Sequence, residues 1–111
     1  MDQECENMIL VLKGLRENKG ITYFCVKLFY GNYMAGEDDI VFNDQNEEMC
    51  NEFENVLVGN ETLEHLAFIN LRFQTNIIES LGKGLAKNKQ LKILNLQGNL
   101  FVLDWFCLIV F

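Results

Sequence analysis

Residues 88–99, NKQLKILNLQGN, fit neither an isolated strand nor an isolated helix. A half-buried strand favours strict alternation of apolar and polar residues, whereas a helix favours apolar residues three or four positions apart. Leucines stand here at spacings of three and then two, at Leu91, Leu94 and Leu96, and an asparagine follows three residues later. We therefore expect a turn that leads into a short strand, with Asn99 bonding the backbone where the chain bends away.

The same arrangement recurs upstream in the chain. An asparagine precedes each apolar cluster, at Asn18, Asn60 and Asn88. The step from the second asparagine to the third is 28 positions, and the step from the first to the second is 42, which is the same period plus 14. Self-similarity at a fixed period is typical of repeat proteins, so we predict three repeated units. Their inward-facing residues are Ile21, Phe24 and Val26, then Leu63, Leu66 and Phe68, then Leu91, Leu94 and Leu96.

Upstream of each asparagine, apolar residues recur three and four positions apart. This spacing places them on one side of a helix, and the other side of the middle helix is polar. Each unit is therefore predicted to be an amphipathic helix, a turn and a strand, whose apolar faces are buried only against the next unit. The apolar helix positions are Met8, Val11 and Leu15, then Cys50, Phe53 and Leu57, then Ile78, Leu81 and Leu85. The polar residues around the middle helix are Gln45, Asn46, Glu47, Glu48, Asn51, Glu52 and Glu54.

The pattern LxxLxLxxN, joined to a helix and a period of 28 positions, resembles the leucine-rich repeat family, specifically its ribonuclease-inhibitor-like class. The third unit matches the pattern in full. At the position of its final asparagine the second unit has Leu71, with Asn70 one place early, and the first unit has Phe29. The resemblance implies an α/β fold, a right-handed solenoid with parallel strands on the concave face and helices on the convex face. It also implies protein binding, because family members commonly use the concave face for this purpose.

Two segments interrupt this scheme. The repeat domain covers residues 1–99 and contains an insertion near 29–44, in which Ile40, Val41 and Phe42 predict that the chain folds back on the body. The insertion either contributes to binding or is simply tolerated. Residues 100–111, LFVLDWFCLIVF, form an apolar C-terminal tail that is too short to span a membrane as a helix. The tail covers the open end of the array, or marks a truncated or alternatively spliced product.

Side chains between the core positions of the strands are predicted to face outward, onto the concave surface. Tyr23, His65 and Ile93 are expected to form one ladder across the strands, and Lys27, Ile69 and Gln97 another. Aromatic and aliphatic anchors carry interface energy, although the same residues also suit a strand for its own sake. The predicted protein-binding residues are Tyr23, Lys27, Glu64, His65, Ile69, Lys92, Ile93, Asn95 and Gln97, and Thr22, Cys25 and Ala67 are expected to face the same way.

Charge and the N-terminal sequence limit the partners and the compartment. The chain has 111 residues, with 16 acidic against 9 basic residues and a formal net charge of −7. Such a chain repels polyanions, so nucleic acid is not expected as a partner. The first residues, MDQECENMILVLKGL, carry acids where a signal peptide requires positive charge. We therefore expect a cytoplasmic, intracellular protein that is not secreted, and a membrane is not expected as a partner.

Catalytic and metal-binding patterns are missing from the sequence. Its four cysteines include no CxxC pair and it has one histidine, so neither a metal site nor a cofactor is expected and the thiols are predicted to be buried and reduced. Cys25 and His65 are predicted to lie on adjacent strands. A nucleophilic site would also require a group that orients the histidine and donors for an oxyanion, and the sequence indicates neither. We therefore expect a protein that is not an enzyme.

The predicted function is non-catalytic protein–protein interaction through the concave face of a short repeat array. One alternative is a regulator of a small GTPase or an inhibitor of an enzyme, by analogy with leucine-rich repeat relatives. A second alternative is a membrane-tethered fragment with residues 100–111 as its anchor. Self-association is also open, because three units are close to the minimum for stability and neither end has an evident polar cap.

Overall fold

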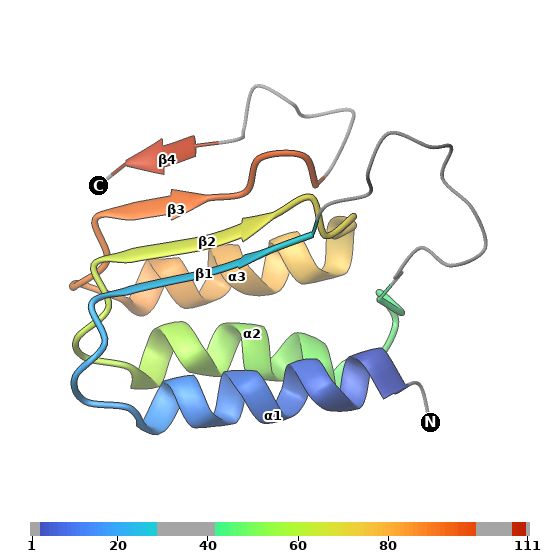
Figure 1. Cartoon of the computed structure of the whole chain (residues 1–111), viewed down its shortest axis with the longest axis horizontal. Coiled ribbons are helices and arrows are strands. Elements are labelled where there is room, and N and C mark those ends of the chain that lie inside the picture. The colour runs from blue at the N-terminus through green and yellow to red at the C-terminus, as the bar shows by residue number, and fades with distance from the viewer. Residues whose placement is uncertain (1–2, 29–41, 100–107, 111) are drawn as a thin grey trace.

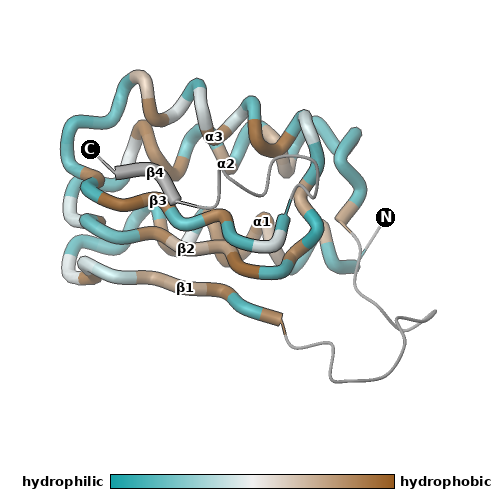
Figure 2. Tube along the Cα trace, turned by 90° about the horizontal axis from the view of Figure 1, so that it is seen from above, coloured by the Kyte–Doolittle hydropathy of each residue, from teal (hydrophilic) through white to brown (hydrophobic). Residues whose placement is uncertain are grey.

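The computed structural model describes residues 3–28, 42–99 and 108–110. Three parallel strands alternate with helices, and a fourth strand pairs antiparallel to the third, giving one sheet in the order β1-β2-β3-β4. The helices lie side by side in a second layer against one face of this sheet (Figures 1 and 2). The predicted α/β class is confirmed at this level. The elements are α1 (Gln3–Glu17), β1 (Tyr23–Lys27), α2 (Glu47–Gly59), β2 (His65–Ile69), α3 (Thr75–Lys87), β3 (Ile93–Asn95) and β4 (Leu108–Val110).

The strands pair in the register that the repeat predicts. Phe24 lies opposite Leu66, and Leu66 lies opposite Leu94. These offsets, 42 and 28 positions, are the same steps that separate the asparagines in the sequence. The adjacency of the segments around residues 24, 66 and 94 is therefore confirmed.

The core lies between the sheet and the helices. Alternate strand residues such as Leu66, Phe68 and Leu94 are fully buried, as expected for one face of a pleated strand. The rings of Phe53 and Phe68 meet edge to face at a centroid distance of 5.4 Å. The ring of Phe53 also contacts that of Phe73, with centroids 5.0 Å apart. Aromatic rings from a helix, a strand and a connecting loop therefore pack together between the two layers.

The three asparagines used to align the units form a hydrogen-bonded ladder at the turns from helix to strand. Asn60 Oδ1 accepts from the backbone N–H groups of Thr62 at 2.8 Å and Leu63 at 2.7 Å, which closes the turn. Its Nδ2 donates to the carbonyl oxygen of Leu15, in the preceding unit, at 2.7 Å. Asn88 repeats this arrangement, because its Nδ2 donates to Leu57 O at 2.7 Å. Sequence reasoning used these residues as landmarks and missed that Asn60 and Asn88 each tie their unit to the unit before it.

Asn99 bonds the backbone as predicted. Its Oδ1 accepts from the N–H groups of Leu71 and Phe73, each at 3.1 Å, and its Nδ2 donates to the carbonyl oxygens of Phe68 and Leu96. The side chain therefore satisfies both the loop of its own unit and that of the preceding unit.

Asn70 supports the same turn one residue earlier in the second unit. Its Nδ2 donates to Leu28 O at 3.4 Å, and its backbone adopts a left-handed conformation with φ 61°. Gly98 stands at the equivalent position of the third unit and also has positive φ, at 78°. Asparagine and glycine are the residues that tolerate this conformation best, which explains the pair.

The prediction for Val11 was wrong. Val11 is 41% exposed, whereas its neighbour Leu12 is fully buried in the core. Helix α1 faces α2 with the side that carries Lys13 and Arg16, which pair with acids of α2. Val11 lies on the opposite flank, where the described part of the chain supplies no further helix.

The prediction for Glu52 was also wrong. This residue was expected on the polar outer side of the middle helix, yet it is only 8% exposed. Its carboxylate accepts a hydrogen bond from Arg16 Nη1 at 3.1 Å, which joins α1 to α2. Amphipathic spacing cannot reveal this burial, because it depends on a cation from the neighbouring helix.

The end of the insertion folds back on the body, as predicted from its apolar residues. Phe42 is buried and its ring contacts that of Phe73 at 5.7 Å. Asp44 accepts from the N–H groups of Asn76 and Ile77, each at 3.0 Å. It thereby caps α3, whose own N-cap residue Gln74 makes no side-chain cap bond. The rest of the insertion, residues 29–41 with Phe29, Ile40 and Val41, lies outside the described residues.

The described part of the tail forms β4, next to β3. Leu94 lies opposite Ile109 in an antiparallel pair. The segment therefore lies along the edge of β3 that faces away from β2. Residues 100–107 and 111 lie outside the described residues. Within the described ranges, no helix has both the length and the apolar character needed to cross a bilayer.

Candidate protein-binding surface

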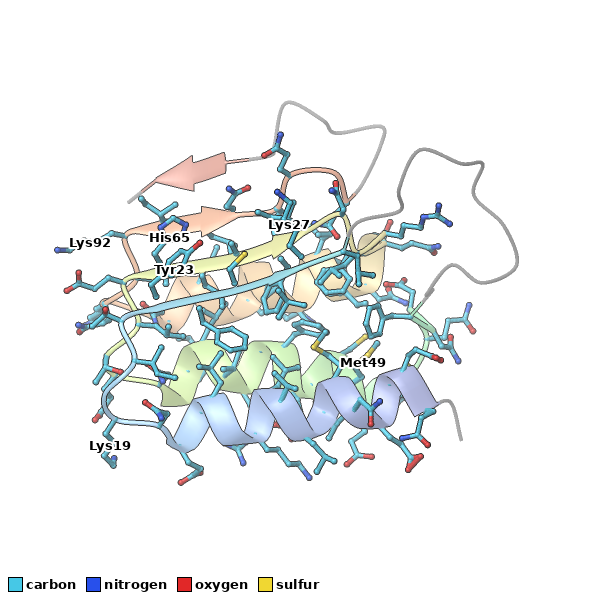
Figure 3. All side chains as sticks on the ribbon, viewed as in Figure 1. Lys19, Tyr23, Lys27, Met49, His65 and Lys92 are labelled. Carbon is cyan, nitrogen blue, oxygen red and sulfur yellow. The ribbon has the colours of Figure 1, made fainter. Side chains whose placement is uncertain are left out.

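The face of the sheet away from the helices carries the side chains that alternate with the core positions, and we call it the open face. Three rows cross it, following the strand register: Tyr23–His65–Ile93, Cys25–Ala67–Asn95 and Lys27–Ile69. Figure 3 shows Tyr23 and His65 next to each other toward one end of the strands, Lys27 toward the other end, and Met49 between the helices and the sheet. The open face is the counterpart of the surface that the sequence predicts for binding.

The first row is an aromatic and aliphatic patch that crosses three strands. The rings of Tyr23 and His65 meet edge to face, with centroids 4.6 Å apart and an interplanar angle of 86°. Tyr23 is 57% exposed, and Ile93 is half-buried on the far side of His65. The predicted ladder is therefore confirmed. Edge-to-face packing restricts the orientation of both rings.

The row at the other end of the strands has two members instead of three. Lys27 lies opposite Ile69, as predicted. The prediction for Gln97 was wrong, because β3 ends at Asn95 and Gln97 lies in the following turn. There its backbone carbonyl accepts from Asn70 N at 2.9 Å. This bond repeats the one from Leu28 N to Ile69 O, so the Gln97 backbone still lies beside the end of β2 although β3 ends two residues earlier, and the positive φ of Gly98 then turns the chain.

Glu64 and Lys92 flank the first row but do not belong to the strands, contrary to the prediction. Each precedes its strand by one residue, and Glu64 O accepts from the N–H groups of Lys92 at 2.8 Å and Ile93 at 3.0 Å. Their side chains form an exposed ion pair at 3.6 Å. Such a pair contributes only about 0–1 kcal/mol to stability.

Thr22 has the same position in the first unit. Its carbonyl oxygen accepts from the N–H groups of Glu64 at 2.8 Å and His65 at 3.0 Å. The prediction that Thr22 lies within the strand was therefore wrong as well. All three residues lead into their strands at the same end of the sheet.

The middle row is small and tightly packed. Ala67 lies on the open face between Cys25 and Asn95, as predicted, but it is only 1% exposed. Its methyl group is too short to emerge between the longer side chains around it. Asn95 is half-buried, and its Oδ1 accepts from Gln97 N at 3.0 Å, which ties it to the turn. The middle row therefore forms the floor between the two outer rows.

Cys25 interacts with Tyr23 on its own strand. A side-chain hydrogen bond with Cys25, followed by the charge of its thiolate form, raises the pKa of the Tyr23 phenol. The hydrogen bond thus favours the neutral form of the phenol. In the strand register Cys25 lies opposite Ala67, whereas His65 lies opposite Tyr23. The thiol and the imidazole are thus on adjacent strands, as predicted, but at different positions along them.

The remaining described cysteines are structural. Cys5 and Cys50 are buried as predicted, whereas Cys25 is half-buried, so the prediction of burial was wrong for that residue. Burial, and then the charge of Asp44, raise the pKa of the Cys50 thiol, whose Sγ lies 3.4 Å from Asp44 O. Cys107 lies outside the described residues. Among the residues that the structure describes, no group of three or more His, Cys, Asp or Glu side chains is placed to hold a metal ion.

Comparison of the chain with models of known protein families, with curated proteins and with solved structures returned no match.

Proposed function

We propose that the chain is a short solenoid of the leucine-rich repeat type, with about three units and a concave open face. The support is the strand register, in which equivalent residues follow at 28 and 42 positions. Further support comes from the asparagine ladder, in which Asn60 and Asn88 each donate across a unit boundary. Side-chain bonds that repeat with the sequence period are what an array of stacked units requires.

We propose that this array binds a protein partner through its open face and carries out no catalysis of its own. The observation that supports this function best is the row Tyr23–His65–Ile93, in which an exposed aromatic ring is fixed by its neighbour. Tyrosine is enriched among the few residues that dominate interface energies, and rigid anchors lose little entropy on binding. The row is also continuous across three strands, so a partner segment can contact all three units at once.

The charges around the row indicate which partner chemistry fits. Lys27 stands at one end of the open face, and the Lys92–Glu64 pair stands at the other. Among the residues that the structure describes, the open face and its flank carry two cations and one acid, on a chain whose net charge is −7. We propose a partner segment that places an apolar or aromatic side chain on Tyr23 and charges of opposite sign near Lys92 and Glu64. Complementary charge of this kind mainly accelerates association and fixes orientation.

We further propose that this binding takes place in the cytoplasm. The support is that the described cysteines, Cys5, Cys25 and Cys50, form no disulfide with one another. Reduced thiols are typical of compartments in which glutathione and thioredoxin remove disulfides.

The proposed function is tested with substitutions on and away from the open face. Tyr23→Ala and Ile93→Ala are compared with Leu10→Ala, which truncates a 68% exposed side chain on α1. The wild-type chain captures partners from a cell extract, and the affinity of each purified partner is then measured for all four proteins. We expect Tyr23→Ala to weaken binding by about 30-fold, the effect of an interface hot spot, and Leu10→Ala to change it less than about two-fold. Partners that bind Tyr23→Ala and Ile93→Ala as tightly as the wild type contradict the proposal.

A further inference from the structure

The row Tyr23–His65–Ile93 runs across the strands of the open face, near one end of them. Tyr23 is 57% exposed, and His65 and Ile93 are half-buried beside it on β2 and β3. Lys92 and Glu64 precede β3 and β2 by one residue and flank this row as an ion pair. Figure 3 shows Tyr23, His65 and Lys92 toward the same end of the strands. A partner segment that contacts the whole row therefore has to lie across the strands and not along one of them.

The distance between paired strands sets the spacing of this row. Neighbouring strands of a sheet lie about 4.8 Å apart. Measured between backbone positions along the row, His65 is therefore about 4.8 Å from Tyr23, and Ile93 is about 9.6 Å from Tyr23. A segment that contacts all three residues has to present side chains at about these intervals.

An α-helix has side chains at this spacing. Positions i, i+3 and i+7 lie on one face of a helix. At a rise of about 1.5 Å per residue, the second and third of these positions lie about 4.5 Å and about 10.5 Å along the axis from the first. Both distances agree with the row to within about 1 Å.

An extended segment laid in the same direction does not have this spacing. Side chains on one side of a strand recur at every second residue, which is about 6.7 Å. Its second and third side chains would miss His65 by about 2 Å and Ile93 by about 4 Å. The spacing of the row therefore favours a helix over a strand as the segment that binds.

We propose that the partner docks an amphipathic helix on the open face, with the helix axis running across β1, β2 and β3. This inference rests on the protein binding proposed above and names the kind of segment that binds. Apolar residues at i and i+7 of the helix lie on Tyr23 and Ile93, and the residue at i+3 covers His65. Recognition of an amphipathic helix through apolar residues one and two turns apart is a recurring mode of peptide binding.

The ion pair beside the row indicates the charges that the helix carries. Because Glu64 and Lys92 precede neighbouring strands, they are also about 4.8 Å apart along the direction of the helix axis. Residues three or four positions apart on a helix are separated by about 4.5–6 Å along the axis. In the direction from β1 to β3, the helix therefore carries a basic residue near Glu64 and, one turn further on, an acidic residue near Lys92. Complementary charges of this kind mainly fix orientation and accelerate association.

Double-mutant cycles with an intact partner test the docked helix. The probe is a purified partner that the wild-type chain captures and the Tyr23→Ala chain does not, and hydrogen exchange locates the segment of it that is protected on binding. Alanine variants of this segment are combined with Tyr23→Ala and with Ile93→Ala, and their affinities are measured. We expect the partner residues coupled to Tyr23 and to Ile93, each by at least about three-fold, to stand seven positions apart. The control Leu10→Ala, on α1, should show no coupling to either residue.

The result separates this inference from the proposed function. Coupled partner residues two to four positions apart, or in separate segments of the partner, overturn the docked helix and leave protein binding through the open face standing. A chain that captures no partner sensitive to Tyr23→Ala contradicts the protein binding itself, and the docked helix with it.

Discussion

Replacing Asn60 by alanine tests how much the hydrogen bonds between units contribute to the stability of the protein. Asn60 is buried, and its side chain bonds both to its own turn and to the preceding unit. Asn60→Ala removes the acceptor for the buried N–H of Leu63 and the donor for the buried carbonyl of Leu15. Each buried group left unpaired costs about 1–3 kcal/mol, so the two together cost about 2–6 kcal/mol. Total stability for a domain of this size is about 5–15 kcal/mol, so the effect is large.

Asn18 is the matched control, because it closes an equivalent turn without a described unit before it. Its Oδ1 accepts from the N–H groups of Gly20 and Ile21, each at 2.8 Å, and these bonds are exposed to solvent. Water can replace them, so Asn18→Ala should cost only about 0.5–1.5 kcal/mol. The difference between the two alanine variants combines the bond across the unit boundary with the burial of the Asn60 turn, and Asn60→Asp separates these two contributions.

The assay is urea unfolding followed by far-ultraviolet circular dichroism, with the free energy extrapolated to water. Asn60→Asp separates the two functions of the amide, because it keeps the acceptor for Leu63 and loses the donor to Leu15. We expect Asn60→Asp to lose stability nearly as much as Asn60→Ala, since a carboxylate would face the Leu15 carbonyl. Equal losses for Asn18→Ala and Asn60→Ala, or wild-type stability for Asn60→Asp, would refute the reasoning.

Three further predictions concern packing, the buried ion pair and pH. A Cβ on Gly84 would lie 2.7 Å from a side-chain carbon of α2, so Gly84→Ala should destabilise the protein by about 1–3 kcal/mol. A Cβ on Gly82 meets open space, so Gly82→Ala should stabilise the protein by about 0.5–1 kcal/mol. Both changes are measured by urea unfolding. Arg16→Ala leaves the buried Glu52 carboxylate unpaired and should cost about 1–3 kcal/mol in the same assay, and an unchanged midpoint contradicts this. Burial raises the pKa of the Cys50 thiol above its ordinary value of 9.0. The neutral thiol therefore contributes its full stability below pH 9.0, and this contribution is lost as the pH rises through the raised pKa. The unfolding midpoints of the wild type and of Cys50→Ala should converge in that alkaline range.

Much of the fold can be predicted from the sequence because a repeated sequence gives a repeated backbone conformation. Residues one period apart occupy the same place in successive units, so Leu66 and Leu94 could be placed opposite each other without any structure. The alternation of strand residues then assigns Tyr23, His65 and Ile93 to one row of the open face. Both inferences rest on geometry that is the same for every unit.

The errors come from places where the units are not equivalent. Val11 is exposed because α1 is the end helix of the described layer, and no sequence pattern marks an end. Gln97 lies outside β3 because the strand ends at Asn95 and the chain turns at Gly98, whose positive φ a glycine in the sequence could have signalled. Glu52 is buried because a neighbouring helix supplies Arg16. Pairings of this kind depend on side chains from two units, which a single alignment of repeats does not specify.

The central claim is that strands separated by 28 and 42 positions stack in parallel and bring Tyr23, His65 and Ile93 into one row. Nuclear Overhauser effects between backbone protons of the labelled chain test this most directly, since adjacent strands bring such protons close together. The claim predicts parallel cross-strand contacts from Phe24 to Leu66 and from Leu66 to Leu94, with contacts between the Tyr23 and His65 rings. Absence of these contacts in a folded sample, or an antiparallel pattern between β2 and β3, would contradict the account.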